Sequence, residues 1–160
     1  MNEVYLLIGG NMGDRIVYLT QAKEEIEKQC GHIIKQSSVY ETAAWGMEEQ
    51  AAFLNQVLEI QTHLSPQQLL RTILTIEEIL GRSRNIKYGP RLIDIDILLF
   101  GDEIIDVYGL KIPHPQMQHR RFVLEPLNEI AAEKIHPVFQ KTIAQLLSAC
   151  TDPLTVNKFS

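Results

Sequence analysis

The sequence of 160 residues has few of the features that mark several protein classes. Its two cysteines, Cys30 and Cys150, form no C-x-x-C pair and have no histidines at zinc-binding spacing. We therefore expect reduced, packed thiols rather than a disulfide or a zinc site. The first apolar run, at 4–8, follows an acidic residue and is too short for a signal or membrane segment. A cytoplasmic protein without membrane contact is expected.

Familiar nucleotide-binding and nucleic-acid-binding signals are also missing. Residues 9–13, after the first apolar run, read GGNMG, which is neither the G-x-G-x-x-G of dinucleotide folds nor the Gly-Lys-Ser/Thr of a P-loop. We interpret residues 9–14 as a tight strand-to-helix turn. The net charge of −5 argues against bulk binding of nucleic acid. The chain has only seven prolines, no repeats and no linker, and 45% of its residues are hydrophobic, which indicates a single domain over residues 1–160. We expect a monomer, although this composition does not determine the oligomeric state.

Hydrophobic periodicity predicts alternating strands and helices. Strands are expected at 4–8, at 32–40, at 53–62, within 89–101 and, briefly, near Ile104. Helices are expected at 13–30, at 65–81 and around 142–150, with 111–122 irregular. The first helical stripe consists of Met12, Ile16, Leu19, Ala22 and Ile26, ending at Gly31, and the second of Leu69, Ile73, Ile76 and Leu80, opened by a capping box at Ser65. This order of strands and helices along the chain is typical of an α+β protein with a ferredoxin-like βαββαβ core and an antiparallel sheet.

The segment GPRLIDIDILLFG, residues 89–101, places two acids inside a pattern that otherwise indicates a buried strand. Because alternate side chains of a strand share a face, Asp94 and Asp96 point the same way with Cα atoms roughly 6.5 Å apart. The opposite face then takes Ile93, Ile95, Ile97 and Leu99. Paired carboxylates suit Mg²⁺, which leaves coordination positions open for substrate phosphates. A half-solvated strand with a polar outer face is the structural alternative.

The same region is the only net-basic part of the chain. Residues 82–121 carry seven lysines and arginines against five acids, whereas residues 1–81 carry five against eleven. Metal-binding carboxylates beside arginines are the composition that a polyphosphate site needs, because metal and guanidinium groups together neutralise phosphate oxygens. A solvated basic face would explain the arginines but not the carboxylates among them.

Five separated blocks carry a resemblance to a known family. They are IGGNMGDR near the start, SSVYET at 37–42, FLNQV at 53–57, GRSRNIKYGPRLIDIDILLFG at 81–101 and IPHPQMQHRRFVLEPLNEI at 112–130. In order and spacing the chain resembles 6-hydroxymethyl-7,8-dihydropterin pyrophosphokinases of folate biosynthesis. The resemblance implies an α/β/α sandwich on the ferredoxin-like core. It also implies transfer of the β,γ-diphosphate of ATP to the pterin hydroxymethyl group, with release of AMP.

The resemblance also implies a set of site residues. Two Mg²⁺ ions are expected on Asp94 and Asp96, which with Arg82 and Arg91 form the catalytic group. The nucleotide side is expected to comprise Glu77, Arg82, Arg84, Arg91, Ile97, Lys111, His114 and Arg120. The pterin side is expected to comprise Thr42, Ala43, Trp45, Phe53, Asn55, Tyr88 and Phe122. ATP and the pterin are the expected partners, with no nucleic acid.

The pterin set makes chemical sense, since a flat heteroaromatic ring needs stacking faces and an amide along its edge. Core packing is the alternative role for Phe53 and Phe122, and a structural histidine is the alternative for His114. Two other function classes remain open. One is a metal-dependent nucleotide hydrolase or nucleotidyl transferase, which would release pyrophosphate rather than AMP. The other is a non-catalytic ligand-binding domain, which would have no need of carboxylates beside arginines.

Overall fold

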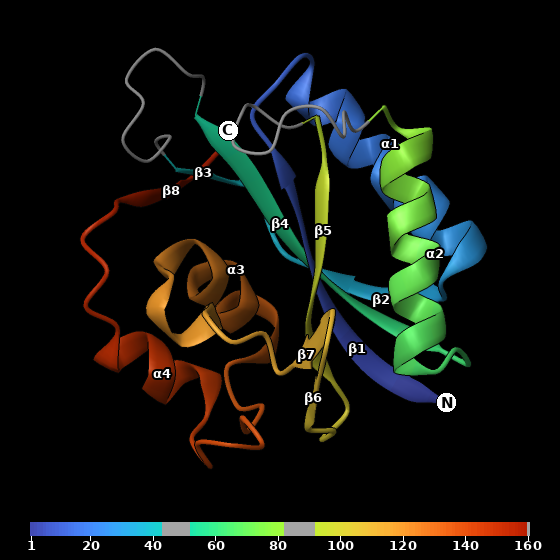
Figure 1. Cartoon of the computed structure of the whole chain (residues 1–160). Helices are drawn as coiled ribbons and strands as arrows, with labels where there is room; N and C mark the ends of the chain where they lie inside the picture. Colours follow the sequence, from blue (N-terminus) through green and yellow to red (C-terminus); the bar gives the residue numbers. More distant parts are fainter. Residues whose placement is uncertain (43–51, 82–91, 160) are drawn as a thin grey trace.

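The computed structural model describes residues 1–42, 52–81 and 92–159, which form a mixed α+β fold around an antiparallel sheet (Figure 1). The strands are β1 (Asn2–Gly10), β2 (His32–Gln36), β3 (Tyr40–Thr42), β4 (Phe53–Thr62), β5 (Asp94–Phe100), β6 (Ile105–Val107), β7 (Leu110–Ile112) and β8 (Val156–Lys158). The helices are α1 (Arg15–Gln29), α2 (Pro66–Ile79), α3 (Arg121–Ala131) and α4 (Ile143–Ala149), with a 3₁₀ turn η1 (Met117–His119). Among the described residues, no helix is long and apolar enough to cross a bilayer.

The main sheet is built on two long central strands. Its order is β5-β1-β4-β3-β8, and β2 also pairs with β4. Strands β1 and β4 pair along their whole length, from Asn2 opposite Thr62 to Gly10 opposite Leu54. The expected turn at 9–14 therefore begins later than predicted, because Gly9 and Gly10 still belong to β1. Strands β6 and β7 form a separate hairpin.

Helices cover both faces of the sheet. In Figure 1, α1 and α2 lie on one side and α3 and α4 on the other. One apolar core joins the sheet to α1 and α2, and its fully buried side chains include Leu6, Ile8, Ile26, Leu54, Leu58, Leu69, Ile73 and Ile76. The second core joins the sheet to α3 and α4, and includes Leu7, Val57, Leu98, Val123, Leu124, Leu127 and Ile143. Side chains alternate along β4, with Leu54 and Val57 in opposite cores.

The prediction of one strand at 32–40 is wrong, because the structure has two strands there, β2 and β3. Between β2 and β3, the Ser37 N–H donates to the carbonyl of Val57 at 2.9 Å, but the Val57 N–H donates to the Ser37 hydroxyl at 3.0 Å. The amide of Gln56 donates to the Ser37 carbonyl at 2.7 Å. A side-chain oxygen thus replaces a backbone acceptor, and regular pairing stops until β3 begins at Tyr40.

The prediction that Leu99 shares a face with the three isoleucines at 93, 95 and 97 is also wrong. Ile93, Ile95 and Ile97 lie in the core under α1 and α2, as expected, but Leu99 lies in the opposite core. The register of β5 shifts against β1 between the pairs Leu6–Ile97 and Tyr5–Leu99. The extra residue at this bulge reverses the alternation for the rest of the strand, because the side-chain period is two.

The first helix has a narrower buried face than the sequence predicts. Leu19, Ala22 and Ile26 are buried, whereas Met12 and Ile16 are each 41% exposed. Asp14 caps the helix and accepts from the Val17 N–H at 3.2 Å, so Met12 precedes the helix and Ile16 lies in its first turn. The buried stripe begins at Leu19. The second helix follows the prediction closely, with the capping box of Ser65 and Gln68 in place.

Helix α3 was not predicted: it begins at the end of the segment 111–122 that we expected to be irregular, and it continues to Ala131. Pro126 sits inside it, and an interior proline removes a helical hydrogen bond, which disfavours a helix in isolation. Four buried apolar residues, Val123, Leu124, Leu127 and Ala131, nevertheless give it one continuous core-facing stripe. Burial against the sheet therefore outweighs the local preference. The last predicted helix is confirmed as α4, capped by Thr142.

Candidate active site

A cavity of about 540 Å³ opens on the face of the sheet that carries α3. Four strands, the η1–α3 junction and a segment near the C-terminus contribute to it. Its lining residues are Leu7, Gly9, Thr42, Phe53, Asn55, Asp94, Asp96, His119, Arg120, Phe122, Asp152, Pro153 and Leu154. Seven predicted site residues are among them, and they come from segments up to 80 positions apart in the chain.

One end of the cavity holds a buried amide. Asn55 is 6% exposed on β4 and pairs in register with Gly9 on β1. A Cβ atom at Gly9 would lie 2.2 Å from Asn55 Oδ1 and 2.6 Å from the Leu54 carbonyl oxygen. Glycine is required here for close approach, since the Asn55 side chain lies where any other residue would place its own. The sequence pattern placed Gly9 in a turn and did not indicate this close approach.

Thr42 and Phe53 are neighbours at the same end. They pair in register across β3 and β4, two pairs further along than Tyr40 and Asn55. The Thr42 hydroxyl is buried and has no hydrogen-bond partner within the described part of the chain. A buried hydroxyl without a partner is costly, so this group is available to a ligand that enters the cavity.

The other end holds the two carboxylates. Asp94 and Asp96 lie on β5 and both line the cavity, while Ile95 between them is in the opposite core, which confirms their shared face. Among the described residues, no group of three or more histidines, cysteines and acids could hold a metal ion. Two carboxylates are nevertheless the kind of protein ligand set that Mg²⁺ uses when phosphates supply further oxygens.

His114 and Arg120 lie near these carboxylates. Burial lowers the pKa of His114; the negative charge of Asp96 opposes this shift, and the positive charge of Arg120 adds to it. Its Nδ1 accepts from the Gln116 N–H at 3.2 Å, so a neutral ring carries its proton on Nε2. His114 thus offers a hydrogen-bond donor without a full charge. It is held beside β5 by its N–H, which donates to the carbonyl of Leu98 at 3.0 Å.

Arg120 and Phe122 border the cavity from the start of α3. The Arg120 guanidinium carbon lies 5.8 Å from the centroid of the Phe122 ring, in a cation–π contact. Phe122 packs partly against the second core and also lines the cavity. Arg120 brings a positive charge to a wall that otherwise has two acids close by, which suits an anionic ligand.

Three predicted nucleotide residues lie away from this cavity. Glu77 is buried on α2 and accepts from the Ile95 N–H at 2.8 Å, on the outer edge of β5. Ile97 is in the core beneath α1 and α2. Lys111 is exposed on β7, where its Nζ lies 3.7 Å from Asp106 Oδ1. None of the three is among the residues that line the cavity, and their roles stay predictions.

Six further predicted residues lie outside the described residues. They are Ala43, Trp45, Arg82, Arg84, Tyr88 and Arg91. The cavity also contains residues that the sequence patterns did not suggest, namely Leu7, Gly9, His119, Asp152, Pro153 and Leu154. Alternation along β1 could have placed Leu7 and Gly9 on one face. No local pattern links residues 152–154 to β5, because only the tertiary fold brings them together.

Comparison with known proteins identifies the family. The family model described as 7,8-dihydro-6-hydroxymethylpterin-pyrophosphokinase (HPPK) matches residues 5–132. The 2-amino-4-hydroxy-6-hydroxymethyldihydropteridine pyrophosphokinase of Aquifex aeolicus is 48% identical over 91% of this chain and 90% of its own length. That of Bacillus subtilis is 46% identical over 82% of this chain and 80% of its own length.

Solved structures give the same fold. A crystal structure of Plasmodium falciparum HPPK-DHPS has a TM-score of 0.74 with this chain at 20% identity. The match covers 93% of this chain and 43% of that one, so it supports the fold alone. The family match and the two bacterial relatives carry the functional assignment: the chain belongs to the HPPK family and is a pyrophosphokinase of folate biosynthesis.

Proposed function

We propose that this chain transfers the β,γ-diphosphate of ATP to the hydroxymethyl group of 6-hydroxymethyl-7,8-dihydropterin, releasing AMP. One observation carries the proposal. A single cavity joins a buried amide and aromatic rings at one end to two carboxylates and an arginine at the other. A reaction between a flat polar ring and a metal-bound polyphosphate needs both binding groups within one cavity, so that the two reactants meet.

The pterin is assigned to the end formed by Thr42, Phe53, Asn55 and Phe122. The Asn55 amide can both donate and accept along the edge of the ring, and the unpartnered Thr42 hydroxyl can meet another polar edge. Phe53 and Phe122 offer apolar faces for stacking. Ala43, Trp45 and Tyr88 remain predicted contacts from the resemblance alone.

The triphosphate is assigned to the carboxylate end. Asp94 and Asp96 would hold Mg²⁺, two ions by the family resemblance, and the bound metal would neutralise phosphate charge and polarise the transferred group. Arg120 supplies a fixed positive charge beside them, and His114 supplies a neutral N–H donor. Arg82 and Arg91 are proposed to complete this charge, and Arg84, Glu77, Ile97 and Lys111 to contact the nucleotide.

The reaction that follows is in-line attack of the pterin hydroxymethyl oxygen on the β-phosphorus, with AMP as leaving group. The chain's own part is to orient the two reactants and to place positive charge where negative charge develops. A loose transition state depends mainly on positioning and electrostatics, so no strong base among the described residues is required. Strands β3 and β4, the start of α3 and residues 152–154 line the ring end. Two reactants seated there would leave less room for water, which would otherwise compete as acceptor.

The finer fold assignment belongs to the same proposal. The order β5-β1-β4-β2 of the four strands that flank α1 and α2 is the order of a ferredoxin-like βαββαβ core. Helices on both faces support the description as an α/β/α sandwich. We propose that this unit works as a single-domain monomer in the cytoplasm.

Product analysis tests the function directly. The protein is incubated with ATP, Mg²⁺ and 6-hydroxymethyl-7,8-dihydropterin, and AMP and the pterin diphosphate are measured. Equal amounts of the two products are expected, with no AMP when the pterin is omitted. Release of pyrophosphate from ATP would instead support the hydrolase or nucleotidyl transferase alternative, and no turnover would support a binding domain.

Charge removal at the carboxylates tests the metal assignment. Asp94→Asn and Asp96→Asn change shape little, so the fold should survive while Mg²⁺-dependent turnover falls by roughly a hundredfold or more. Asp102→Asn is the matched control, because Asp102 is an exposed acid whose partner is Lys134, at 2.8 Å. Loss of stability with a normal rate in the two strand variants would contradict the metal role.

A further inference from the structure

The C-terminal segment 150–154 forms one wall of the cavity, although it lies beyond the residues that the family match covers. Asp152, Pro153 and Leu154 line the space, and Cys150 ends helix α4. In Figure 1 this part of the chain runs from α4 past α3 to the sheet edge at β8. None of its residues belongs to a strand or helix that would hold it in place by backbone pairing.

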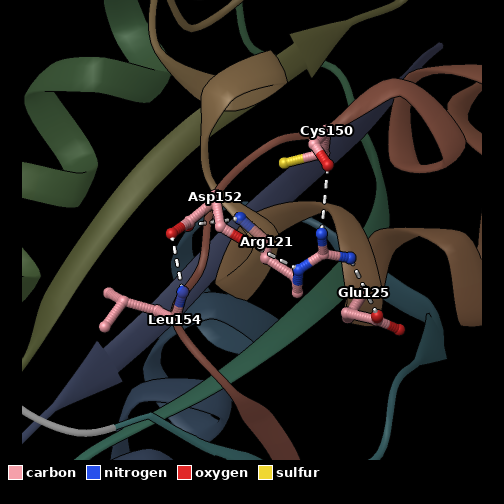
Figure 2. Close-up of polar contacts among 5 residues, drawn as sticks. All are labelled: Arg121, Glu125, Cys150, Asp152 and Leu154. Atoms are coloured by element: carbon pink, nitrogen blue, oxygen red, sulfur yellow. Dashed lines mark hydrogen bonds and ion pairs between the residues drawn. The ribbon is translucent and has the colours of Figure 1, made fainter.

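Arg121 holds this segment through its guanidinium. Its Nε donates to the Asp152 carbonyl at 3.2 Å, and its Nη2 donates to the Cys150 carbonyl at 3.1 Å (Figure 2). A third contact, 3.8 Å between Nη1 and a carboxylate oxygen of Glu125, lies along α3 at spacing i, i+4. The fork geometry of arginine lets one side chain bind two carbonyls at once, which lysine cannot reproduce.

Asp152 completes the attachment from the other side. One carboxylate oxygen accepts from the Arg121 N–H at 3.0 Å, and the other accepts from the Leu154 N–H at 3.0 Å (Figure 2). The first of these bonds caps α3, whose own N-cap residue, Arg120, makes no side-chain cap. The second forms a local turn that sets the course of the chain at Leu154.

The wall lies at the end of the cavity assigned to the pterin. Two residues after Leu154, Val156 pairs with Thr42 across β8 and β3, and Thr42 pairs with Phe53. The segment therefore spans from the start of α3, where Phe122 lies, to the strand that carries Thr42. Asp94 and Asp96 lie on β5, at the opposite edge of the sheet from β8.

We propose that Arg121 and Asp152 are positioning residues for the pterin site, because they fix segment 152–154 as one of its walls. This inference rests on the proposed function for the identity of the ligand. Both carboxylate oxygens of Asp152 already accept backbone hydrogen bonds, so Asp152 acts through position rather than as a base. Leu154 and Pro153 supply the apolar surface that an aromatic ring prefers.

Ligand affinities test the proposal more directly than turnover does. For Arg121→Ala, calorimetry should show pterin binding weakened by about tenfold, while binding of a non-hydrolysable ATP analogue with Mg²⁺ changes by less than about twofold. The turnover number at saturating pterin should be nearly retained, because no reacting group is removed. Asp152→Ala should behave in the same way.

Two further variants keep the test decisive if Arg121→Ala folds poorly. Leu154→Ala shortens the wall without touching either anchor, and should also weaken pterin binding alone. Combined with Arg121→Ala, it should weaken binding by less than the product of the two separate effects, since a released wall no longer offers Leu154 to the ring. Glu125→Gln, which removes only the contact along α3, is the control and should keep both affinities.

Unchanged pterin affinity in Arg121→Ala and Leu154→Ala would overturn the proposal, as would equal loss of both affinities. The outcome is separable from that of the proposed function. If the wild-type protein binds the pterin but forms no AMP, the reaction assignment fails while the wall can still be tested by binding. If wild type forms AMP and the variants bind the pterin normally, only the positioning role fails.

Discussion

At the scale of single residues, the cavity depends on a position with no side chain. Gly9 faces Asn55 across β1 and β4, and an added Cβ would lie 2.2 Å from the amide oxygen. Because the Leu54 carbonyl would also be only 2.6 Å away, rotation of the amide alone could not make room. The backbone or the whole strand pair must shift, which couples stability to the geometry of the site.

We therefore expect Gly9→Ala to lower the free energy of unfolding by roughly 1–3 kcal/mol and to weaken pterin binding. Denaturant unfolding and calorimetry measure the two effects. Gly101→Ala is the matched control: its φ of +54° strains any other residue, but a Cβ there meets nothing within 4 Å. That variant should lose stability and keep its pterin affinity. Normal pterin affinity in Gly9→Ala would show that pterin binding does not depend on the present position of the Asn55 side chain.

The sequence predicted residues of the site when chemistry and strand alternation agreed. Asp94 and Asp96 share a face because they are two apart, and Asn55 shares one with Phe53 for the same reason. Sequence patterns did not identify a residue that matters because it has no side chain, or one that only the tertiary fold brings to the cavity. Gly9 carries no chemical group, and Asp152 lies at the cavity beside Arg121, which is 31 positions away in the chain.

At the scale of elements, the docking of α3 against the sheet determines the shape of the cavity. Its first residue is tied to Asp152, and Glu129 near its end is tied to β3. The Tyr40 hydroxyl donates to one oxygen of Glu129 at 2.6 Å, and the N–H and hydroxyl of Ser38 donate to the other. The helix is thus attached at both ends, with its apolar stripe between.

This attachment should depend on pH. Partial burial opposes ionisation of Glu129, but hydrogen bonds from Tyr40 and Ser38 and the charge of Lys158 hold the pKa of Glu129 below its ordinary value of 4.5. A carboxyl with a lowered folded pKa contributes stability above the ordinary value and loses it as the pH falls through the lowered one. The contribution is therefore complete at neutral pH.

We expect Tyr40→Phe to lower the free energy of unfolding by about 1 kcal/mol at neutral pH, because the aromatic ring stays and only the donor is lost. The difference from wild type should shrink as the pH falls below about 4.5, where protonation weakens the same bond in the parent protein. Urea unfolding at several pH values measures it. A difference that stays constant down to about pH 3 would show that the carboxylate form is not what Tyr40 stabilises.

Elements were predictable from sequence where local signals and packing agreed, as in α2 with its capping box, its proline and its apolar stripe. Helix α3 was missed because Pro126 opposes it locally, while burial against β4 and α4 favours it. The break after β2 and the bulge in β5 were missed for a related reason. Both depend on how a strand meets its partner, through Ser37 in one case and the shift at Ile97 in the other.

At the scale of the whole molecule, two apolar cores lie on opposite faces of one sheet, and the cavity is on the side of α3 alone. The residues of the core under α1 and α2 do not line the cavity, so that core contributes by holding the strands in place from the opposite face of the sheet. A ligand in the cavity contacts β1, β3, β4, β5, α3 and the C-terminal segment together, and such a surface exists only when the chain is folded. Ligand binding and global stability should therefore be linked.

We expect the pterin, at about a hundred times its dissociation constant, to stabilise the fold by about 2.7 kcal/mol. For a chain of this size the melting temperature should rise by roughly 5–10 °C. Asn55→Ala should lose most of that rise, since it removes the buried amide at the ring edge. Ser65→Ala is the control: it weakens the cap of α2 on the far face, so it should melt lower without ligand yet show the full rise with it. The two rises are measured by scanning calorimetry. Equal rises in wild type and Asn55→Ala would show that the ring does not bind against Asn55, which lines this cavity.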